Sequence, residues 1–314
     1  MEYSVSSEDV FAAAARLDGI VKRTPVVSAE GIDEIAGRQV LMKCENLQHI
    51  GAFKFRGATN AVIMLGDAAE KGVCTHSSGN HAQALSMAAK NRGVDAYIVM
   101  PKTAPRVKVL GVKDQGAELT FCEPTLAARE STAGEIIDRT GAALVHPYDN
   151  PDVIAGQGTA ALEFFQQAGE LDAIVSPVGG GGLMSGTSVT IRAVTPDARI
   201  FGAEPAGADD AARSLEAGEF LPQTGPDTIC DGLLTSMGEH TWPIIRDHLE
   251  TIIRVTDEQV VEAMRLILDN LGMVVEPSGA VSLAAVLTPE FKELKGIDRV
   301  GVILSGGNVD SLPF

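Results

Sequence analysis

The sequence is short of basic residues, with 25 lysines and arginines against 42 acidic residues and a formal net charge of −17. This balance excludes a broad positive surface for nucleic acid or an anionic membrane, so any anionic ligand must be held locally. No apolar run reaches the roughly 20 residues that span a bilayer, and the acidic N-terminal residues lack the apolar core of a signal peptide. We therefore expect a cytoplasmic protein that binds neither nucleic acid nor membranes.

Cysteine and histidine are also scarce. The four cysteines, Cys44, Cys74, Cys122 and Cys230, lie far apart and form no C-x-x-C pair. That spacing predicts neither a thiolate metal site nor a disulfide framework, and four reduced thiols are expected. The six histidines show no paired ligand spacing, which disfavours transition-metal catalysis.

Aromatic residues make up only 4% of the chain, whereas glycine occurs 33 times, which is typical of a helix-and-strand protein with many tight turns. Short apolar runs alternate with amphipathic stretches after a first helix that Ser7 should cap. The predicted strands are residues 24–27, 38–43, 73–76, 97–101, 118–121, 143–146, 173–177, 199–203, 251–255 and 300–304. The later predicted helices are residues 28–36, 54–65, 81–92, 107–115, 126–140, 158–168, 184–194, 257–271 and 279–286.

This alternation predicts an α/β protein of two lobes, each an open, mostly parallel, twisted sheet flanked by helices. Residues 66–150 should form the smaller domain. Residues 1–65 contain too little material to fold alone, so we expect them to join residues 151–314 in a large domain.

Lys54 is the first candidate for chemistry. It stands between Phe53 and Phe55, with Gly51 and Gly57 allowing the backbone to approach a ligand closely. Desolvation there favours the uncharged amine, which is a nucleophile and in enzymes commonly forms a Schiff base with a carbonyl. The structural alternative is a lysine whose stem covers apolar surface while its head reaches water.

A run of four glycines, residues 179–182, lies between a predicted strand and a predicted helix. Successive glycine amides can point inward, and the positive end of the following helix completes a phosphate cradle. The nucleotide motifs do not fit, because Thr187 stands where a Walker lysine should be and no G-x-G-x-x-G pattern is present. The run is therefore either a structural turn or a cradle for a single small phosphate.

Two further turns follow predicted parallel strands, where open α/β sheets place their ligands. The turn at residues 77–81, Ser-Ser-Gly-Asn-His, could hold a carboxylate or move a proton, and residues 305–308, Ser-Gly-Gly-Asn, occupy a similar position. An ordinary capped turn is the alternative for each. A third segment, residues 204–210, gathers three acids and could be either a hard-cation site or a solvated acidic loop.

Taken together, these motifs resemble the fold type II family of pyridoxal-phosphate enzymes, within it the branch of serine racemases and serine/threonine dehydratases, including 3-hydroxyaspartate dehydratases. The resemblance runs through almost the whole chain in the family's order. The motifs that carry it are Ala-Phe-Lys-Phe-Arg-Gly-Ala, Ser-Ser-Gly-Asn-His, Val-Ile-Ala-Gly-Gln-Gly-Thr at 153–159, the four glycines, Val-Val-Glu-Pro-Ser-Gly at 274–279 and Leu-Ser-Gly-Gly-Asn. One departure is Ala52, where many members have serine, which leaves the substrate contacts open.

The resemblance implies a role for each matching residue. Lys54 would form the Schiff base with pyridoxal 5'-phosphate, and Ser78 would stand across the cofactor from it. The other implied cofactor contacts are Phe53 against the ring, Asn80 at the ring hydroxyl, Gly179, Gly180, Gly181 and Gly182 around the phosphate, and Ser305 at the ring nitrogen. The implied substrate contacts are Ser77, Ser78, Gly79, Asn80 and His81. Glu204, the carbonyl of Ala208, and Asp210 would bind a divalent cation, Mg²⁺ or in its place Ca²⁺ or Mn²⁺.

These implications lead to a predicted function. We expect a pyridoxal-phosphate ammonia-lyase that removes water and then ammonia from serine, threonine or 3-hydroxyaspartate, and that forms a homodimer. A neutral hydroxyl at Ser305 makes the cofactor a weaker electron sink, which suits elimination more than transamination. One alternative is a serine or aspartate racemase that uses Lys54 and Ser78 on opposite faces. A non-enzymatic alternative is a protein that binds the cofactor without turnover. A dicarboxylic substrate would need a second cationic or amide-rich contact, which the sequence leaves open.

Overall fold

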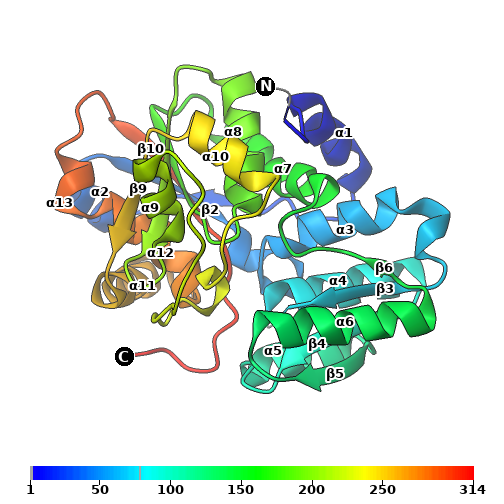
Figure 1. Cartoon of the computed structure of the whole chain (residues 1–314). Helices are drawn as coiled ribbons and strands as arrows, with labels where there is room; N and C mark the ends of the chain where they lie inside the picture. The colour runs from blue at the N-terminus through cyan, green and yellow to red at the C-terminus, as the bar shows by residue number, and fades with distance from the viewer. Residues whose placement is uncertain (1–2, 78) are drawn as a thin grey trace.

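The computed structural model describes residues 3–77 and 79–314, and the chain forms two open sheets, each flanked by helices (Figure 1). One sheet has six strands in the order β1-β2-β10-β7-β8-β9, and the other has four in the order β5-β4-β3-β6. Their pairs run parallel except β1 with β2, which is antiparallel. The predicted α/β fold class is therefore confirmed.

The larger sheet draws its strands from both ends of the chain, whereas the smaller one uses a single central segment. The larger sheet consists of β1 Val26–Val27, β2 Gln39–Cys44, β7 Ala173–Pro177, β8 Arg199–Pro205, β9 Thr251–Val255 and β10 Arg299–Leu304. The smaller sheet consists of β3 Val73–His76, β4 Ala96–Pro101, β5 Glu118–Cys122 and β6 Ala143–Leu144. The domain boundaries at residues 65 and 150 stay a prediction.

Helices connect and cover the strands. They are α1 Ser7–Leu17, α2 Glu30–Ala36, α3 Lys54–Met64, α4 Asn80–Arg92, α5 Arg106–Asp114, α6 Leu126–Thr140, α7 Pro151–Ala168, α8 Gly182–Val194, α9 Asp210–Ala217, α10 Thr241–His248, α11 Asp257–Leu271, α12 Pro277–Val286 and α13 Pro289–Lys292. Short 3-10 turns occur at η1 Glu45–Leu47, η2 His49–Gly51, η3 Gly66–Ala69 and η4 Asp231–Leu233. None of the helices in the described part of the chain is long and apolar enough to cross a membrane.

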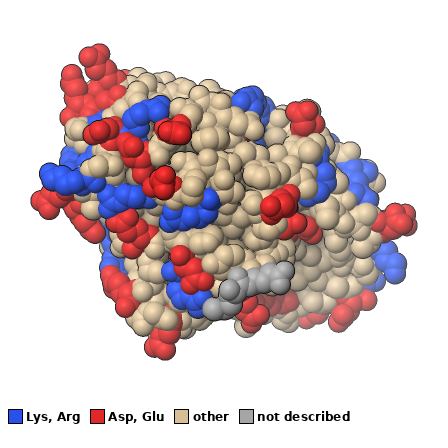
Figure 2. Space-filling model, turned by 90° about the horizontal axis from the view of Figure 1, so that it is seen from above, with Lys and Arg blue, Asp and Glu red and all other residues tan. Residues whose placement is uncertain are grey.

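On the face that Figure 2 shows, the basic side chains are not gathered in one area. Acidic and basic side chains are interspersed there, with large uncharged areas between them. That face therefore offers no continuous positive surface of the kind that nucleic acid requires.

The predicted helix starts lie within two residues of the observed ones except at α7, and the cap of α1 also differs. Ser6, not Ser7, caps α1, because its side chain accepts a hydrogen bond from the amide of Asp9 and the Asp9 side chain accepts one in return. Helix α7 begins at Pro151, seven residues before the predicted start at Gly158, with Asn150 as its cap. Glycines usually weaken a helix, and Gly156 and Gly158 are the reason that the first turns of α7 were not predicted from the sequence.

Those glycines are needed where helices meet. A Cβ atom on Gly156 would lie 2.6 Å from the Cα of Gly57 in α3, and one on Gly158 would lie 2.9 Å from the carbonyl oxygen of Gly186 in α8. Helix α7 therefore packs backbone against backbone on both neighbours, a spacing that no larger residue permits. This contact sets the position of α3, the helix that begins with Lys54.

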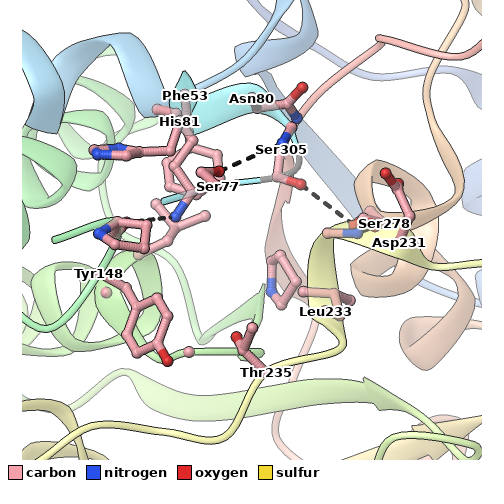
Figure 3. A pocket seen from close by; sticks show the side chains of 18 of the residues that line it. Phe53, Ser77, Asn80, His81, Tyr148, Asp231, Leu233, Thr235, Ser278 and Ser305 are labelled. Atoms are coloured by element: carbon pink, nitrogen blue, oxygen red, sulfur yellow. Dashed lines mark hydrogen bonds between the residues drawn. The ribbon is translucent and has the colours of Figure 1, made fainter. Parts of the chain in front are cut away.

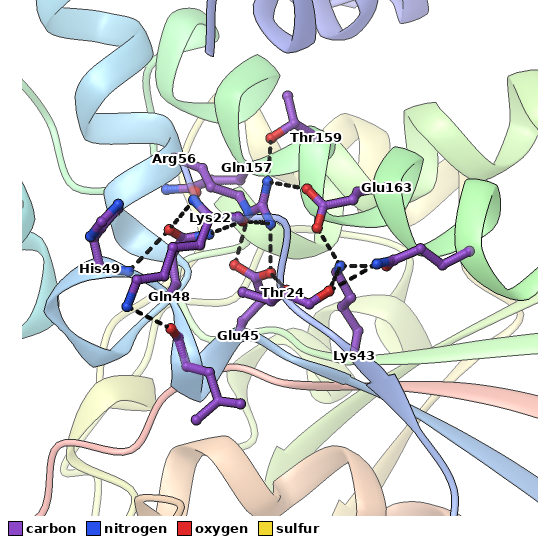
Figure 4. A network of polar contacts seen from close by, with 12 residues as sticks. Lys22, Thr24, Lys43, Glu45, Gln48, His49, Arg56, Gln157, Thr159 and Glu163 are labelled. Carbon is purple, nitrogen blue, oxygen red and sulfur yellow. Dashed lines mark hydrogen bonds and ion pairs between the residues drawn. The ribbon is translucent and has the colours of Figure 1, made fainter. Parts of the chain in front are cut away.

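A buried ion network lies beneath the first turn of α3 (Figure 4). Arg56 donates to both carboxylate oxygens of Glu45 at 2.8 Å, and the two side chains are 1% and 0% exposed. Glu163 of α7 accepts from Arg56 at 3.1 Å and from Lys43 at 2.6 Å. Burial alone would raise the pKa of Glu45, but the charge and hydrogen bonds of Arg56 lower it, so the pair is ionised at neutral pH.

This network generates a stability prediction. Glu45→Gln would leave the buried Arg56 without its main counter-charge, and breaking a buried pair in this way costs about 3 kcal/mol of unfolding free energy. Urea unfolding of the variant should show that loss. Glu123→Gln is the control, because Glu123 pairs with Lys102 on the surface, where both side chains are more than half exposed. Equal unfolding midpoints for the wild type and Glu45→Gln would refute the prediction.

Candidate functional site

A cavity between the two lobes collects most of the residues that the sequence singled out (Figure 3). It opens at the ends of β3, β7 and β10, where the strands lead into loops. The predicted residues that line it are Phe53, Lys54, Ser77, Gly79, Asn80, His81, Gly180, Gly181, Gly182 and Ser305. Gly179 is not among the lining residues, and Ser78 lies outside the residues that the structure describes.

Lys54 is partly buried at the start of α3 and faces this cavity. Its Nζ donates a hydrogen bond of 2.7 Å to the carbonyl oxygen of Pro147 and lies 5.1 Å from the ring centre of Phe53. Among the described residues no carboxylate forms an ion pair with it. Desolvation lowers the pKa of Lys54 to about 8, so a substantial fraction of the amine is neutral and nucleophilic near physiological pH.

Two histidines near the amine, His81 and His146, favour the neutral form. Burial lowers the pKa of His146 to about 4, and the nearby charges of His76 and Lys54 act in the same direction. His81 has its pKa lowered well below the usual range by burial and then by Lys54. Its Nε2 lies 3.2 Å from the carbonyl oxygen of Val145. Lys54 is therefore the basic group in this part of the cavity.

The glycine run forms the turn from β7 into α8. Gly179 and Gly181 have φ angles of 51° and 87°, in the left-handed region that favours glycine. A Cβ atom on Gly180 would lie 2.4 Å from the ring of Tyr148, so only glycine fits there. The first amides of an α-helix have no partner within it. The start of α8 therefore offers amide donors and a positive helix end to an anion in the cavity.

Ser305 directly follows β10 and is 3% exposed. Its hydroxyl donates to the carbonyl oxygen of Ser278 at 3.3 Å, and no charged group bonds to it among the described residues. The site thus presents a neutral hydroxyl at this wall, and it lines the same cavity as Lys54 and the glycine turn.

Asn80 takes part in a network that the sequence did not reveal. Its Nδ2 donates to Glu276 at 2.5 Å, and its Oδ1 accepts from Asn308 at 2.9 Å. Glu276 also pairs with the buried Lys108 at 3.1 Å, and Lys108 pairs with Asp231 at 2.6 Å. Burial raises the pKa of Glu276 while the charge of Lys108 lowers it. Lys108 comes from α5 of the smaller lobe, so this network joins the two lobes across the cavity.

Several residues that line the cavity were not predicted from the sequence. Glu276 lies in the segment Val-Val-Glu-Pro-Ser-Gly, which could have marked it. Lys108, Tyr148, Asp231 and Arg129 stand in ordinary sequence, and only the fold brings them to the cavity.

The predicted cation residues lie outside the cavity lining. Glu204 is inside β8 and Asp210 begins α9, and neither side chain is exposed, so the alternative of a solvated loop is wrong for both. Oε1 of Glu204 and both carboxylate oxygens of Asp210 lack a hydrogen-bond partner among the described residues. Burial and then the charge of Asp210 raise the pKa of Glu204 well above its usual value, and burial raises that of Asp210 to about 6.

These donors suit a hard cation but not a soft one. Two carboxylates and the backbone at Ala208, which is also buried, supply oxygen ligands of the kind that Mg²⁺ and Ca²⁺ prefer. The described residues contain no cluster of three histidine, cysteine, aspartate or glutamate side chains that could hold a metal ion. A cation at Glu204 would therefore depend on a backbone oxygen or on water.

The cavity residues fit pyridoxal phosphate. The Lys54 amine can join to the aldehyde, the turn at Gly180 to Gly182 can hold the phosphate, and the Ser305 hydroxyl can face the ring nitrogen. Only glycine fits at Gly180 and Gly181 of this turn, because added Cβ atoms would meet Tyr148 and Thr241 at less than 3 Å.

Comparisons with known proteins agree with this fit. A sequence model of the family described as "Pyridoxal-phosphate dependent enzyme" matches residues 17–306. A serine racemase of Dictyostelium discoideum is 48% identical over 310 residues, covering 98% of this chain and 96% of the relative. A beta-hydroxyaspartate dehydratase of Paracoccus denitrificans is 47% identical over 310 residues, covering 98% of each chain.

The solved structure of maize serine racemase superposes with a TM-score of 0.96 at 43% identity, covering 98% of this chain and 95% of that one. The family model and both relatives span nearly all of the chain, including Lys54, the glycine turn and Ser305. The protein therefore belongs to the pyridoxal-phosphate dependent enzymes of fold type II.

Proposed function

We propose that this enzyme removes water from a small β-hydroxy amino acid, and that hydrolysis of the resulting enamine or imine then releases ammonia and a 2-oxo acid. One observation carries the proposal. The amine of Lys54, with its pKa lowered to about 8, opens onto the same cavity as the glycine turn and the neutral hydroxyl of Ser305. The beta-hydroxyaspartate dehydratase at 47% identity supports this reaction class.

When bound, pyridoxal phosphate withdraws electrons from the α-carbon of an amino acid joined to its aldehyde and so acidifies the α-proton. The protein supplies the base and the orientation. The amine of Lys54 can take the α-proton, because its lowered pKa of about 8 makes its neutral form accessible near physiological pH. The neutral Ser305 limits electron withdrawal, which favours loss of a β-hydroxyl over transamination.

The loop from Ser77 to His81 is placed to bind the substrate carboxylate. Ser77 follows β3, and its Oγ accepts a hydrogen bond of 3.4 Å from the amide of Gly79. Asn80 starts α4, so the loop presents amides at a helix N-terminus, where anions bind well. An α-carboxylate held there would lie in the same cavity as Lys54.

Racemisation is a second candidate, and the similarity to the Dictyostelium and maize serine racemases supports it. It would need a second acid or base on the face opposite Lys54. Ser78 is the predicted group, although it lies outside the described residues. Both reactions begin with loss of the same α-proton, so one site can perform both.

We also propose that Glu204, the Ala208 carbonyl and Asp210 bind a divalent cation, with Mg²⁺ as the first candidate. The three unpartnered carboxylate oxygens support it, because buried carboxylates are costly without a counter-charge.

Replacing Lys54 tests the elimination. Lys54→Ala in enzyme supplied with cofactor should lower the rate of 2-oxo acid formation at least about 10³-fold, because the variant lacks both the Schiff-base amine and the base. Oxo acid and ammonia should be measured separately with serine, threonine and 3-hydroxyaspartate. Lys71→Ala is the control, since Lys71 is an exposed lysine outside the cavity lining. Full turnover by Lys54→Ala would remove the assigned role.

Racemisation can be separated from elimination at Ser78. Ser78→Ala should slow formation of the opposite enantiomer about 10²-fold more than it slows oxo acid formation, because elimination needs no proton on the second face. Chiral analysis of serine alongside the oxo acid assay measures this ratio. An unchanged ratio would mean that another group serves the second face.

Binding of a divalent cation should raise the thermal stability of the protein. Mg²⁺ at about 100 times its dissociation constant should raise the melting temperature of chelator-treated protein by about 5 °C. Asp210→Asn should abolish the increment. Asp209→Asn is the matched control, because Asp209 pairs with Arg213 and Arg254 at 2.9 Å and should leave the increment in place. The same melting temperature with chelator and with Mg²⁺, Ca²⁺ or Mn²⁺ would exclude the site.

A further inference from the structure

We propose that the enzyme has a second small-molecule site, separate from the cofactor cavity, that binds an apolar α-amino acid between Arg23 and Asp18. The site is a cavity of about 400 Å³ beside the C-terminal end of α1, and this volume is typical of small-molecule sites. It shares no lining residue with the cofactor cavity. The inference does not depend on the proposed elimination.

The walls of this second cavity come from α1, the segment that follows it, and α7. Three of the lining residues, Leu17, Val21 and Leu162, are buried or half-buried, so they give the cavity an apolar side. The other lining residues are Ala14, Ala15, Asp18, Gly19, Arg23, Arg56, Thr159, Glu163 and Gln166.

The floor of the second cavity is polar, and its charges are already balanced. Arg56 is 1% exposed and donates to Glu45 and Glu163, and Glu163 also accepts from Lys43 (Figure 4). Two cationic side chains thus face two carboxylates within the network. Because no charge is left over, the floor selects neither a simple anion nor a simple cation.

The entrance of the second cavity carries two charges of opposite sign. Asp18 and Arg23 both line it, both residues are exposed, and neither forms an ion pair within the described part of the chain. One guanidinium nitrogen of Arg23 donates to Oε1 of Gln166 at 3.3 Å, which leaves the other N–H groups for a ligand. An acid and a base that line one cavity without pairing with each other suit a ligand that carries both charges.

A free α-amino acid is such a ligand, because its ammonium and carboxylate stand on one carbon atom. Its carboxylate would bind the planar fork of Arg23, and its ammonium would bind Asp18. The third substituent of that carbon atom would then lie against Leu17, Val21 and Leu162. Burial of an aliphatic group there favours binding, so valine or leucine should bind more tightly than glycine.

Titration calorimetry of the holoenzyme tests the site. Borohydride should first reduce the cofactor onto Lys54, so that an added amino acid cannot join the aldehyde in the cofactor cavity. Valine should then bind with a dissociation constant of about 1 mM or lower. Glycine should bind at least about 10-fold more weakly, because it lacks the apolar side chain. The same loss is expected for 3-methylbutanoate, which lacks the ammonium, and for isobutylamine, which lacks the carboxylate.

Variants of the two charged residues locate the binding. Arg23→Gln and Asp18→Asn should each weaken valine at least about 10-fold, because each removes one charged contact. Arg106→Gln and Asp67→Asn are the matched controls, since both residues are exposed and line neither cavity. These controls should keep the wild-type dissociation constant.

Three results would overturn the second site. They are no binding of valine or leucine at about 10 mM, equal affinity for valine and the two ligands that carry one charge, and unchanged affinity in both Arg23→Gln and Asp18→Asn. The last result would mean that valine binds elsewhere, such as at the loop from Ser77 in the cofactor cavity. None of the three bears on the elimination, which is measured as oxo acid formation by the unreduced enzyme.

Discussion

The buried pair of Arg56 and Glu45 is the constraint on which the site depends. Arg56 stands two residues after Lys54 in the first turn of α3, and its guanidinium is fixed from three sides by Glu45, Glu163 and the carbonyl oxygen of Lys22. Glu163 in turn neutralises Lys43, so one network ties β2, α3 and α7 together. Because charges buried in this way cannot move without losing their partners, the amine of Lys54 is presented from a rigid base rather than from a loop. The close glycine contacts between α7 and α3 fix the same helix.

Much of this architecture could be predicted from the sequence. Runs such as Ala173–Pro177 and Arg299–Leu304 are nearly continuous apolar segments, as strands buried on both faces of a parallel sheet must be, and they were found within one residue. The start of α7 was missed because Gly156 and Gly158 resemble loop residues until the helices that approach them are known. Helix α9 was not predicted because its acidic first residue, Asp210, suggested a ligand loop and not the start of a helix.

The candidate site divides in the same way. Four features were identifiable because each follows a strand or begins a helix with an unusual local composition. They are Lys54, the glycine turn, the loop that begins at Ser77, and Ser305. Lys108 and Asp231 were not identifiable, because their roles arise from pairing between segments more than 100 residues apart, which no local pattern describes. Asn80 lies between these cases, since its place in the cavity was predicted but its bonds to Glu276 and Asn308 were not.

The bridge made by Lys108 has a consequence for how the cleft exchanges its contents. This ammonium belongs to the smaller lobe, whereas both of its carboxylate partners belong to the larger one. Drawing the lobes apart would separate the buried ammonium of Lys108 from the buried carboxylate of Glu276 and leave both poorly solvated until water filled the gap. Release of a product through that opening would therefore require hydration of the bridge. A single electrostatic barrier would then limit the rates of both events.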